Sequence, residues 1–334
     1  MASIGIIANP ASGKDIRRLV SYATTIDNNE KVNICKRIVL AAQGLGITDI
    51  VFMPETFMIG TAVKDDLKSD GVLTAGISLL DFEIDASLSD TVTAARMMAE
   101  MDVGCVVILG GDGTCRAAAK GIGNTPILPI STGTNNVYPA MMEGTVAGMA
   151  AAAAAFMGGN ACCIRDKRIE VSINGEYRDL ALVDAVVSDD FYAGAKAIWD
   201  ARRIKRIFVS RCHPATIGFS AVAGVWEIVE DTDDHGLAVT LGGGGSRVLA
   251  PIAAGVLTPV EITGARRIPL GGCDEFTASQ PCMIALDGER EIRANPGDRV
   301  SFTLSRLGPR RILPREILRE AARLGIYKNQ MNKE

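Results

Sequence analysis

The first 158 residues alternate short, continuously apolar runs with segments whose apolar residues recur at helical spacing. Residues 3–8 form one such run, and residues 103–109 (VGCVVIL) form another. Between them, residues 89–100 have the spacing of a helix with one apolar face. A strand that is apolar on both faces must be covered on both sides. Helices that alternate with such strands provide this cover in a parallel sheet.

The pattern changes near residues 158–160, after which short strand-like segments are separated by turn signals. Asn174-Gly175 is typical of a tight hairpin turn between two antiparallel strands. The four consecutive glycines at 242–245 are expected to form a loop. We therefore predict two domains. An N-terminal α/β domain with a Rossmann-like parallel sheet spans residues 1–158, and a C-terminal, all-β, sandwich-like domain spans residues 161–308.

The C-terminal segment has the signals of one further helix. Pro314 suits the first turn of a helix, and Gly325 suits its end. Between them, apolar residues recur on one face. We predict that a C-terminal helix, residues 312–330, packs back onto the N-terminal domain.

Composition excludes several classes of protein. The chain has 334 residues, is 48% hydrophobic and carries a formal net charge of −4. This length suits two domains, and the apolar content excludes a wholly disordered, collagen-like or coiled-coil chain. The mild acidity and the absence of a Lys/Arg block argue against nucleic acid as a partner.

Nothing in the sequence indicates a membrane or a secretory segment. The N-terminus lacks a basic region followed by an apolar stretch. The longest apolar run, residues 146–157, is shorter than the roughly 20 residues that span a bilayer, so we expect a buried helix there. The eight cysteines contain no C-x-x-C pair, which favours reduced thiols in a cytoplasmic protein. Cys212-His213 lacks partners at zinc-ligand spacing, and the identity of any metal ligand stays open.

Gly110-Gly111-Asp112-Gly113-Thr114 directly follows the apolar run 103–109 and precedes a helix-like segment. In a parallel sheet, ligands bind at the carboxyl ends of the strands. Glycines let the backbone approach a ligand closely, and the N–H groups at a helix start suit phosphate. Asp112 would then accept a proton from an attacking hydroxyl or hold a metal ion. The alternative is an ordinary strand-to-helix turn with a solvated aspartate.

A second polar loop, residues 131–136 (STGTNN), follows the short strand-like run 127–130. Its hydroxyl, amide and backbone groups donate hydrogen bonds without carrying charge. Two such loops after neighbouring parallel strands would form one phosphate cradle. The alternative is a Ser/Thr or Asx turn that caps the next helix.

A third loop, residues 9–14 (NPASGK), follows the first apolar run. It is not a Walker A motif, because Ala8 stands where the first glycine is needed and Asp15 where Ser or Thr is needed. The loop still lies at the ligand-binding edge of the sheet, which leaves a phosphate role for Ser12 or Lys14 open.

The combination of these three loops resembles the NAD kinase/diacylglycerol kinase superfamily, and within it the ATP-NAD/AcoX kinase-like proteins. Looser matches follow in the family order along the second half of the chain, at residues 166–171, 181–187, 218–224, 286–289 and 296–300. The resemblance covers nearly the whole chain. It implies ATP-dependent phosphorylation in the cleft between an α/β domain and a β-sandwich, with ATP and Mg²⁺ as cofactors.

The resemblance also implies the roles of individual residues. Asp112 corresponds to the aspartate that activates a ribose hydroxyl of NAD in NADP biosynthesis. The residues expected to bind nucleotide are Asn9, Ser12, Gly110, Gly111, Gly113, Thr114, Thr132, Gly133, Thr134, Asn135, Asn136, Asp184 and Ser220, with Lys14, Asp287 and Glu289 as further candidates. Relatives are commonly oligomeric and exposed sandwich edges are usually covered, so a homodimer or homotetramer is expected.

Three departures leave the phosphate acceptor open. NAD kinases usually carry Asn-Glu where this chain has Val183-Asp184, and the stretch at 218–222 also differs. The 131–136 turn is more similar to that of diacylglycerol kinases. The leading interpretation is a kinase for NAD or a related small molecule. The alternatives are a diacylglycerol- or sphingosine-type lipid kinase, and an inactive nucleotide-binding regulator. A phosphofructokinase-like sugar kinase fits the second half less well.

Overall fold

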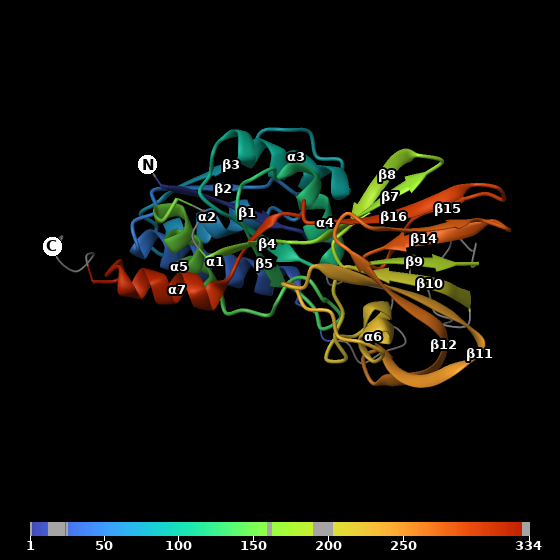
Figure 1. Ribbon diagram of the computed structural model, residues 1–334. Coiled ribbons are helices and arrows are strands. Elements are labelled where there is room, and N and C mark those ends of the chain that lie inside the picture. The colour runs from blue at the N-terminus through green and yellow to red at the C-terminus, as the bar shows by residue number, and fades with distance from the viewer. Residues whose placement is uncertain (1, 13–23, 25, 159–161, 190–202, 329–334) are drawn as a thin grey trace.

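The computed structural model describes residues 2–12, 24, 26–158, 162–189 and 203–328. Figure 1 shows an α/β region and an all-β region side by side. The α/β region contains a seven-stranded sheet, and the all-β region contains a six-stranded and a four-stranded sheet. This arrangement confirms the predicted fold class.

The seven-stranded sheet has the strand order β3-β2-β1-β4-β5-β17-β6. The first five strands in this order pair in parallel, β17 is parallel to β5, and β6 is antiparallel to β17. The strands are β1 (Ser3–Ala8), β2 (Asp49–Phe52), β3 (Gly76–Leu79), β4 (Val106–Gly110), β5 (Ile127–Ser131), β6 (Cys163–Arg165) and β17 (Arg310–Ile312).

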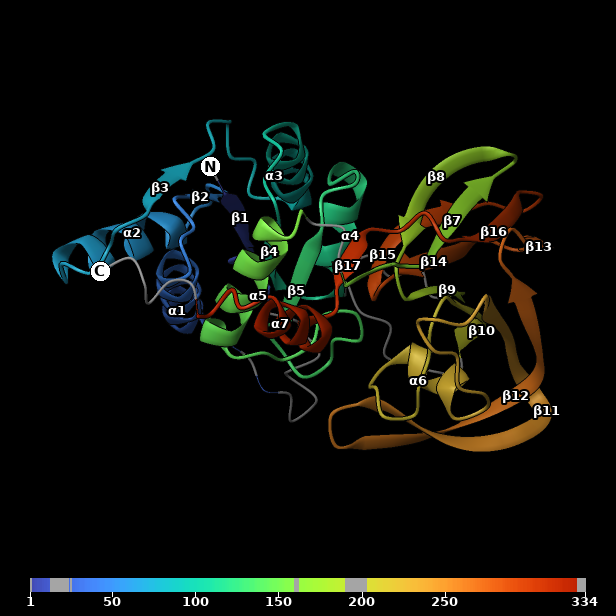
Figure 2. The ribbon, with the colours of Figure 1, turned by 60° about the vertical axis from the view of Figure 1, so that its left-hand side comes forward.

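Helices cover both faces of this sheet, as the apolar strands require. In both views α3 and α4 lie on one face, and α1, α5 and α7 lie on the other (Figures 1 and 2). Successive side chains of β1 alternate between the two cores, since Ile6 joins the α1/α5 cluster and Ile7 joins the α3/α4 cluster. The helices are α1 (Asn28–Gly44), α2 (Ile59–Ser69), α3 (Leu88–Glu100), α4 (Asp112–Gly121), α5 (Gly144–Phe156) and α7 (Pro314–Arg323).

The apolar run at 146–157 lies in α5, which packs against α1. Residues 150–154, all alanine, are fully buried there. Gly148 permits this close packing, because a Cβ at this position would lie 2.4 Å from the carbonyl oxygen of Ile38 in α1. No helix within the described part of the chain is long and apolar enough to cross a membrane.

The all-β region consists of two antiparallel sheets, in the orders β12-β11-β10-β9-β14-β15 and β13-β16-β7-β8. Phe208 and Phe302 stack in the core between them, with ring centroids 5.8 Å apart. A short helix, α6 (Phe219–Gly224), packs against the larger sheet. The strands are β7 (Arg168–Ile173), β8 (Glu176–Ala181), β9 (Asp184–Ser188), β10 (Ile204–Val209), β11 (His235–Ala253), β12 (Val256–Pro269), β13 (Cys273–Thr277), β14 (Cys282–Leu286), β15 (Glu289–Ala294) and β16 (Arg299–Ser305).

Of two turns predicted from the sequence in this region, one is confirmed and the other is wrong. Asn174 and Gly175 both have positive φ, at 55° and 83°, and they connect β7 to β8 as predicted. The expectation of a loop at residues 242–245 is wrong, because these glycines lie inside β11. The ladder shifts there, so that Leu241 and Ser246 both oppose Ile262 of β12. Glycines therefore form a bulge that bends a long two-stranded ribbon, which curves around α6 in Figure 2.

The chain passes between the two regions twice, and the two passages are neighbours. β6 still belongs to the seven-stranded sheet, and residues 166–167 lead from it into β7. The chain returns from β16 into β17, where Arg310 pairs with Arg165 of β6. The predicted helix at 312–330 is shorter in the structure: Ile312 belongs to β17, the helix spans 314–323, and residues 329–330 lie outside the described part.

We expect α7 to contribute to the core of the α/β region. Ile317 is fully buried in the α1/α5 cluster, so Ile317→Ala should lower the free energy of unfolding by about 2–5 kcal/mol through the lost contacts and the cavity left behind. Leu324, at the end of the same helix, is 50% exposed, and Leu324→Ala is the matched control. Urea unfolding followed by circular dichroism measures both variants. Equal effects would contradict the docking of α7.

Candidate functional site

The carboxyl ends of β1, β4 and β5 lie next to one another, and the three polar loops follow these strands. Two side-chain hydrogen bonds join the loops directly. The Asn9 amide nitrogen donates to the Thr114 hydroxyl at 2.8 Å, and the Thr132 hydroxyl donates to the Ser12 hydroxyl at 3.0 Å. The structure therefore brings the three sequence motifs together at one edge of the sheet, where ligands bind in open α/β sheets.

The loop after β1 is held by a buried lysine that sequence reasoning missed. Lys31, in the first turn of α1, is fully buried and donates from Nζ to the carbonyl oxygens of Asn9 at 2.9 Å and Ser12 at 2.8 Å. The Asn28 side chain accepts a further hydrogen bond at 3.1 Å. Because these carbonyls point toward Lys31, the loop is fixed from its inner side. Lys14 lies outside the described residues.

The turn between β4 and α4 has no room for side chains at its two glycines. A Cβ on Gly110 would lie 2.5 Å from the Thr114 Cβ, and a Cβ on Gly111 would lie 2.8 Å from the Asn136 side-chain oxygen. The glycines therefore let the helix start directly at the strand end, against the loop that follows β5. The N–H groups in the first turn of a helix lie outside its own hydrogen-bond ladder, a feature of the α4 start that suits an anion.

Asp112 is the first residue of α4, and its half-buried carboxylate binds the loop after β5. It accepts the backbone N–H of Tyr138 at 2.7 Å and that of Val137 at 3.1 Å. The carboxylate that the motif placed at the site thus also fixes the neighbouring loop. Its position depends on these two amides.

Many polar groups of the loop after β5 form hydrogen bonds within the protein. The Ser131 hydroxyl donates to the carbonyl of Gly133 at 2.6 Å and accepts from the Asn136 amide at 2.8 Å. The Thr134 hydroxyl accepts from the backbone of Thr24 at 3.3 Å. Ser131 and Asn136 therefore shape a local turn. The next helix, α5, is capped by Glu143, so this loop does not form the helix cap that the alternative interpretation expected. Thr134 is the loop's exposed residue, and Gly133, Asn135 and Asn136 are half-buried.

From the all-β region, Asp287 and Gly288 form the two-residue turn between β14 and β15, both with positive φ, at 49° and 85°. The Asp287 carboxylate accepts the backbone N–H groups of Leu182 and Val183, each at 2.8 Å, and of Asp184 at 3.1 Å. Burial raises the pKa of Asp287, and Arg116 and these backbone donors offset part of that rise. Asp287 is thus engaged in fixing residues 182–184.

Residues 180–183 dock the all-β region on α4. Leu180, Leu182 and Val183 belong to the apolar cluster that contains Cys115 and Ala118 of α4. Burial raises the pKa of the Cys115 thiol well above its usual value, and the carboxylates of Asp112 and Asp287 raise it further. The Asp112 and Asp287 carboxylates therefore both lie close enough to Cys115 of α4 to affect its pKa. Asp184 follows directly, buried at the start of β9.

Charged side chains join α4 to the all-β region. The central one, Arg116, was not predicted from the sequence. Arg116 is 1% exposed, lies 2.8 Å from a carboxylate oxygen of Asp179 in β8, and lies 3.6 Å from one of Glu289 in β15. Glu289 also lies over the first turn of α4, since a Cβ on Gly113 would be 2.7 Å from its carboxylate. The predicted Glu289 is therefore next to the motif, and Arg116 ties the two regions together.

Ser220 lies apart from these contacts. It belongs to α6, which packs against β10 and β11. The side chain is 1% exposed, and its hydroxyl makes no hydrogen bond to any residue of the described ranges. The structure therefore does not join Ser220 to the three loops.

Within the residues that the structure describes, no group of three His, Cys, Asp or Glu side chains is arranged to hold a metal ion. Protein sites for Mg²⁺ commonly use only one or two carboxylates together with substrate phosphates. Asp112 is the carboxylate that stands among the loops. The residues present thus suit a cation that is held mainly by a bound nucleotide.

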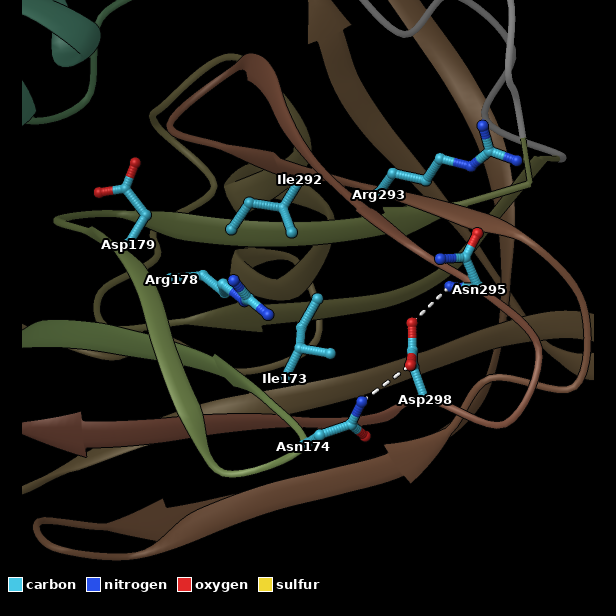
Figure 3. A pocket seen from close by; sticks show the side chains of 8 residues that line it. All are labelled: Ile173, Asn174, Arg178, Asp179, Ile292, Arg293, Asn295 and Asp298. Carbon is cyan, nitrogen blue, oxygen red and sulfur yellow. Dashed lines mark hydrogen bonds between the residues drawn. The ribbon is translucent and has the colours of Figure 1, made fainter.

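A hollow of about 550 Å³ lies in the all-β region, between the β7–β8 and β14–β15 hairpins (Figure 3). Two of its lining side chains, Ile173 and Ile292, are apolar, and the others are polar or charged. Asp298 links its two sides by accepting from the Asn174 amide and the Asn295 backbone at 2.9 and 2.7 Å. No residue predicted to bind nucleotide lines this hollow, so the three loops remain the candidate site.

Comparison with known proteins agrees with both halves of the chain. Residues 4–160 match the ATP-NAD kinase N-terminal domain, and residues 167–307 match the acetoin catabolism protein X C-terminal domain. Acetoin catabolism protein X of Cupriavidus necator is 37% identical over 314 residues, which cover 90% of this chain and 87% of that protein. In fold, the chain is similar to yeast NADH kinase complexed with NADH, with a TM-score of 0.52 at 11% identity, covering 98% of this chain and 88% of the kinase.

The glycine positions at the site make a matched stability test. Gly110→Ala should lower the free energy of unfolding by about 1–3 kcal/mol, because its methyl group would overlap Thr114. Gly133→Ala should change it by less than about 0.5 kcal/mol, since the nearest atom to its Cβ would be 3.6 Å away. Urea unfolding measures both variants. The close packing at Gly110 would be refuted by two variants of equal stability.

Proposed function

The chain belongs to the acetoin catabolism protein X family, and from this premise we propose that it is an ATP-dependent phosphotransferase acting on a hydroxyl of NAD or a related small molecule. The observation that carries the proposal is the meeting of three loops at the start of α4, with the Asp112 carboxylate among them. Phosphoryl transfer depends mostly on positioning and on charge neutralisation. The three loops would supply the positioning, and a bound cation would supply the neutralisation.

In this proposal the triphosphate lies over the three loops. The first-turn N–H groups of α4 face the phosphates, as helix starts do at other phosphate sites. Gly133 and Thr134 offer backbone and hydroxyl donors from the third loop. When bound, Mg²⁺ would neutralise phosphate charge and would be held mainly by the phosphates; Asp112 as its protein ligand is the alternative to the role of base assigned below.

The transfer step needs a proton acceptor next to the attacking hydroxyl. The acceptor oxygen forms a bond to the γ-phosphorus while the bond from that phosphorus to the β-phosphate oxygen breaks, and ADP leaves. We assign the hydroxyl proton to the Asp112 carboxylate, which is oriented by the amides of Val137 and Tyr138. An oriented carboxylate at a strand end is suited to a general base.

The all-β region supports binding of the acceptor in the same proposal. Residues 182–184 are fixed by Asp287, and Leu182 and Val183, which precede Asp184, pack against α4. We assign Asp184 to the hydroxyl groups of the acceptor's ribose. Glu289, which lies over Gly113, is a second carboxylate at this boundary.

We expect Asp112→Asn to lower kcat by about 100-fold or more, because an amide cannot accept the hydroxyl proton. The dissociation constant of a non-hydrolysable ATP analogue should change little, since asparagine keeps the shape and one acceptor oxygen. ATP consumption with NAD as acceptor, coupled to detection of NADP, measures transfer. Asp65→Asn, on the exposed surface of α2, is the matched control.

Testing several phosphate acceptors distinguishes a kinase for NAD from a lipid kinase and from an inactive regulator. NAD and NADH test the leading proposal, and diacylglycerol and sphingosine in mixed micelles test a lipid kinase. ATP binding without transfer to any acceptor would indicate a nucleotide-binding regulator and overturn the proposed activity. Undiminished transfer by the Asp112→Asn variant would overturn only the assignment of Asp112 as the base and would leave the proposed activity standing.

A further inference from the structure

A buried carboxylate stands where the chain passes between the two regions. Asp166 is fully buried between β6 and β7. It accepts the Tyr138 hydroxyl at 2.6 Å, an Arg211 nitrogen at 2.9 Å and two Arg311 nitrogens at 2.8 and 3.0 Å. Both carboxylate oxygens are therefore fully engaged, and all three partners are side chains from distant parts of the sequence.

The three partners belong to three separate elements. Tyr138 lies in the loop after β5, Arg211 follows β10 of the all-β region, and Arg311 lies in β17. Both guanidinium groups also lie over the Tyr138 ring, 5.0 and 5.8 Å from its centroid. Asp231 binds both arginines as well, so two carboxylates balance two guanidinium charges. The cluster thus links the site loop to both regions.

The direction of the Tyr138 bond is set by the surrounding charges. Burial alone would raise the pKa of Asp166, but Arg211 and Arg311 outweigh it and hold that pKa below its usual value. Burial and the neighbouring Asp166 raise the pKa of the Tyr138 phenol. Asp166 is therefore the ionised acceptor and Tyr138 the protonated donor, in a short charge-assisted hydrogen bond.

Tyr138 is bound at both ends. Its hydroxyl donates to Asp166, and its backbone N–H donates to the Asp112 carboxylate at 2.7 Å. We propose that Tyr138 is a positioning residue: by its bond to Asp166 it fixes the amides that orient Asp112, and so places the proton acceptor relative to the all-β region. The positioning of Asp112 follows from the geometry, whereas its effect on phosphate transfer rests on the proposed function.

Tyr138→Phe removes only the hydroxyl. The ring stays under both guanidinium groups, and the two carboxylates still balance the two arginines. We expect the amides of residues 137 and 138 to exchange with solvent deuterium about tenfold faster or more. We expect kcat to fall by about tenfold or more, because small misplacements of a reacting group are costly. The KM for ATP and the affinity for a non-hydrolysable analogue should stay within about twofold, since the residues over which the triphosphate lies are unchanged.

Tyr177→Phe is the matched control, because it makes the same change at an exposed tyrosine of β8. It should alter neither exchange at 137–138 nor kcat. Arg211→Lys is a second variant, which keeps the charge but not the planar fork, and it should shift both readouts in the same direction as Tyr138→Phe. Thermal unfolding of each variant verifies that it is folded.

The outcomes separate this inference from the proposed function. Faster exchange together with a lower kcat at unchanged nucleotide affinity supports the inference. Unchanged exchange in Tyr138→Phe overturns it, whatever the activity. Faster exchange with unchanged kcat, in a wild-type protein that transfers phosphate, overturns the role in transfer. A wild-type protein with no transfer to any acceptor overturns the proposed function, and exchange then still decides whether Tyr138 positions Asp112.

Discussion

The site depends on one constraint of the sheet, which is that β1, β4 and β5 are neighbours and run parallel. Their carboxyl ends must therefore meet at one edge, and the loop after each strand must share the same small space. The missing Cβ at Gly110 allows α4 to start directly at that edge. The order and direction of the strands alone thus bring three loops that are far apart in the sequence into one surface.

Many polar side chains of the site bind one another. Asn9 holds Thr114, Ser131 holds Asn136, and Asp112 holds the loop after β5. These polar side chains are not simply ligand contacts, because their hydrogen bonds to one another fix the loops. These hydrogen bonds hold the three loops in one arrangement and keep the backbone N–H groups of the edge in place.

The all-β region is fastened to α4 and to the passages of the chain. Arg116 reaches Asp179 and Glu289 from α4, and apolar residues 180–183 pack on the same helix. Asp166 binds arginines from β17 and from the end of β10. Because a buried charge is costly without its partner, each of these contacts favours one placement of the two regions.

Periodicity, glycine and turn chemistry act over a few residues, so the sequence alone predicts the α/β and all-β regions, the three loops and the Asn174-Gly175 turn. It misjudged the glycines at 242–245, since a bulge needs a partner strand to be recognised. The partners of the buried charges follow from the three-dimensional fold. Arg116 and Asp179 are 63 residues apart, and Arg311 and Asp166 are 145 apart. Whether a charge is buried and paired depends on which distant segment covers it, and no local pattern carries that information.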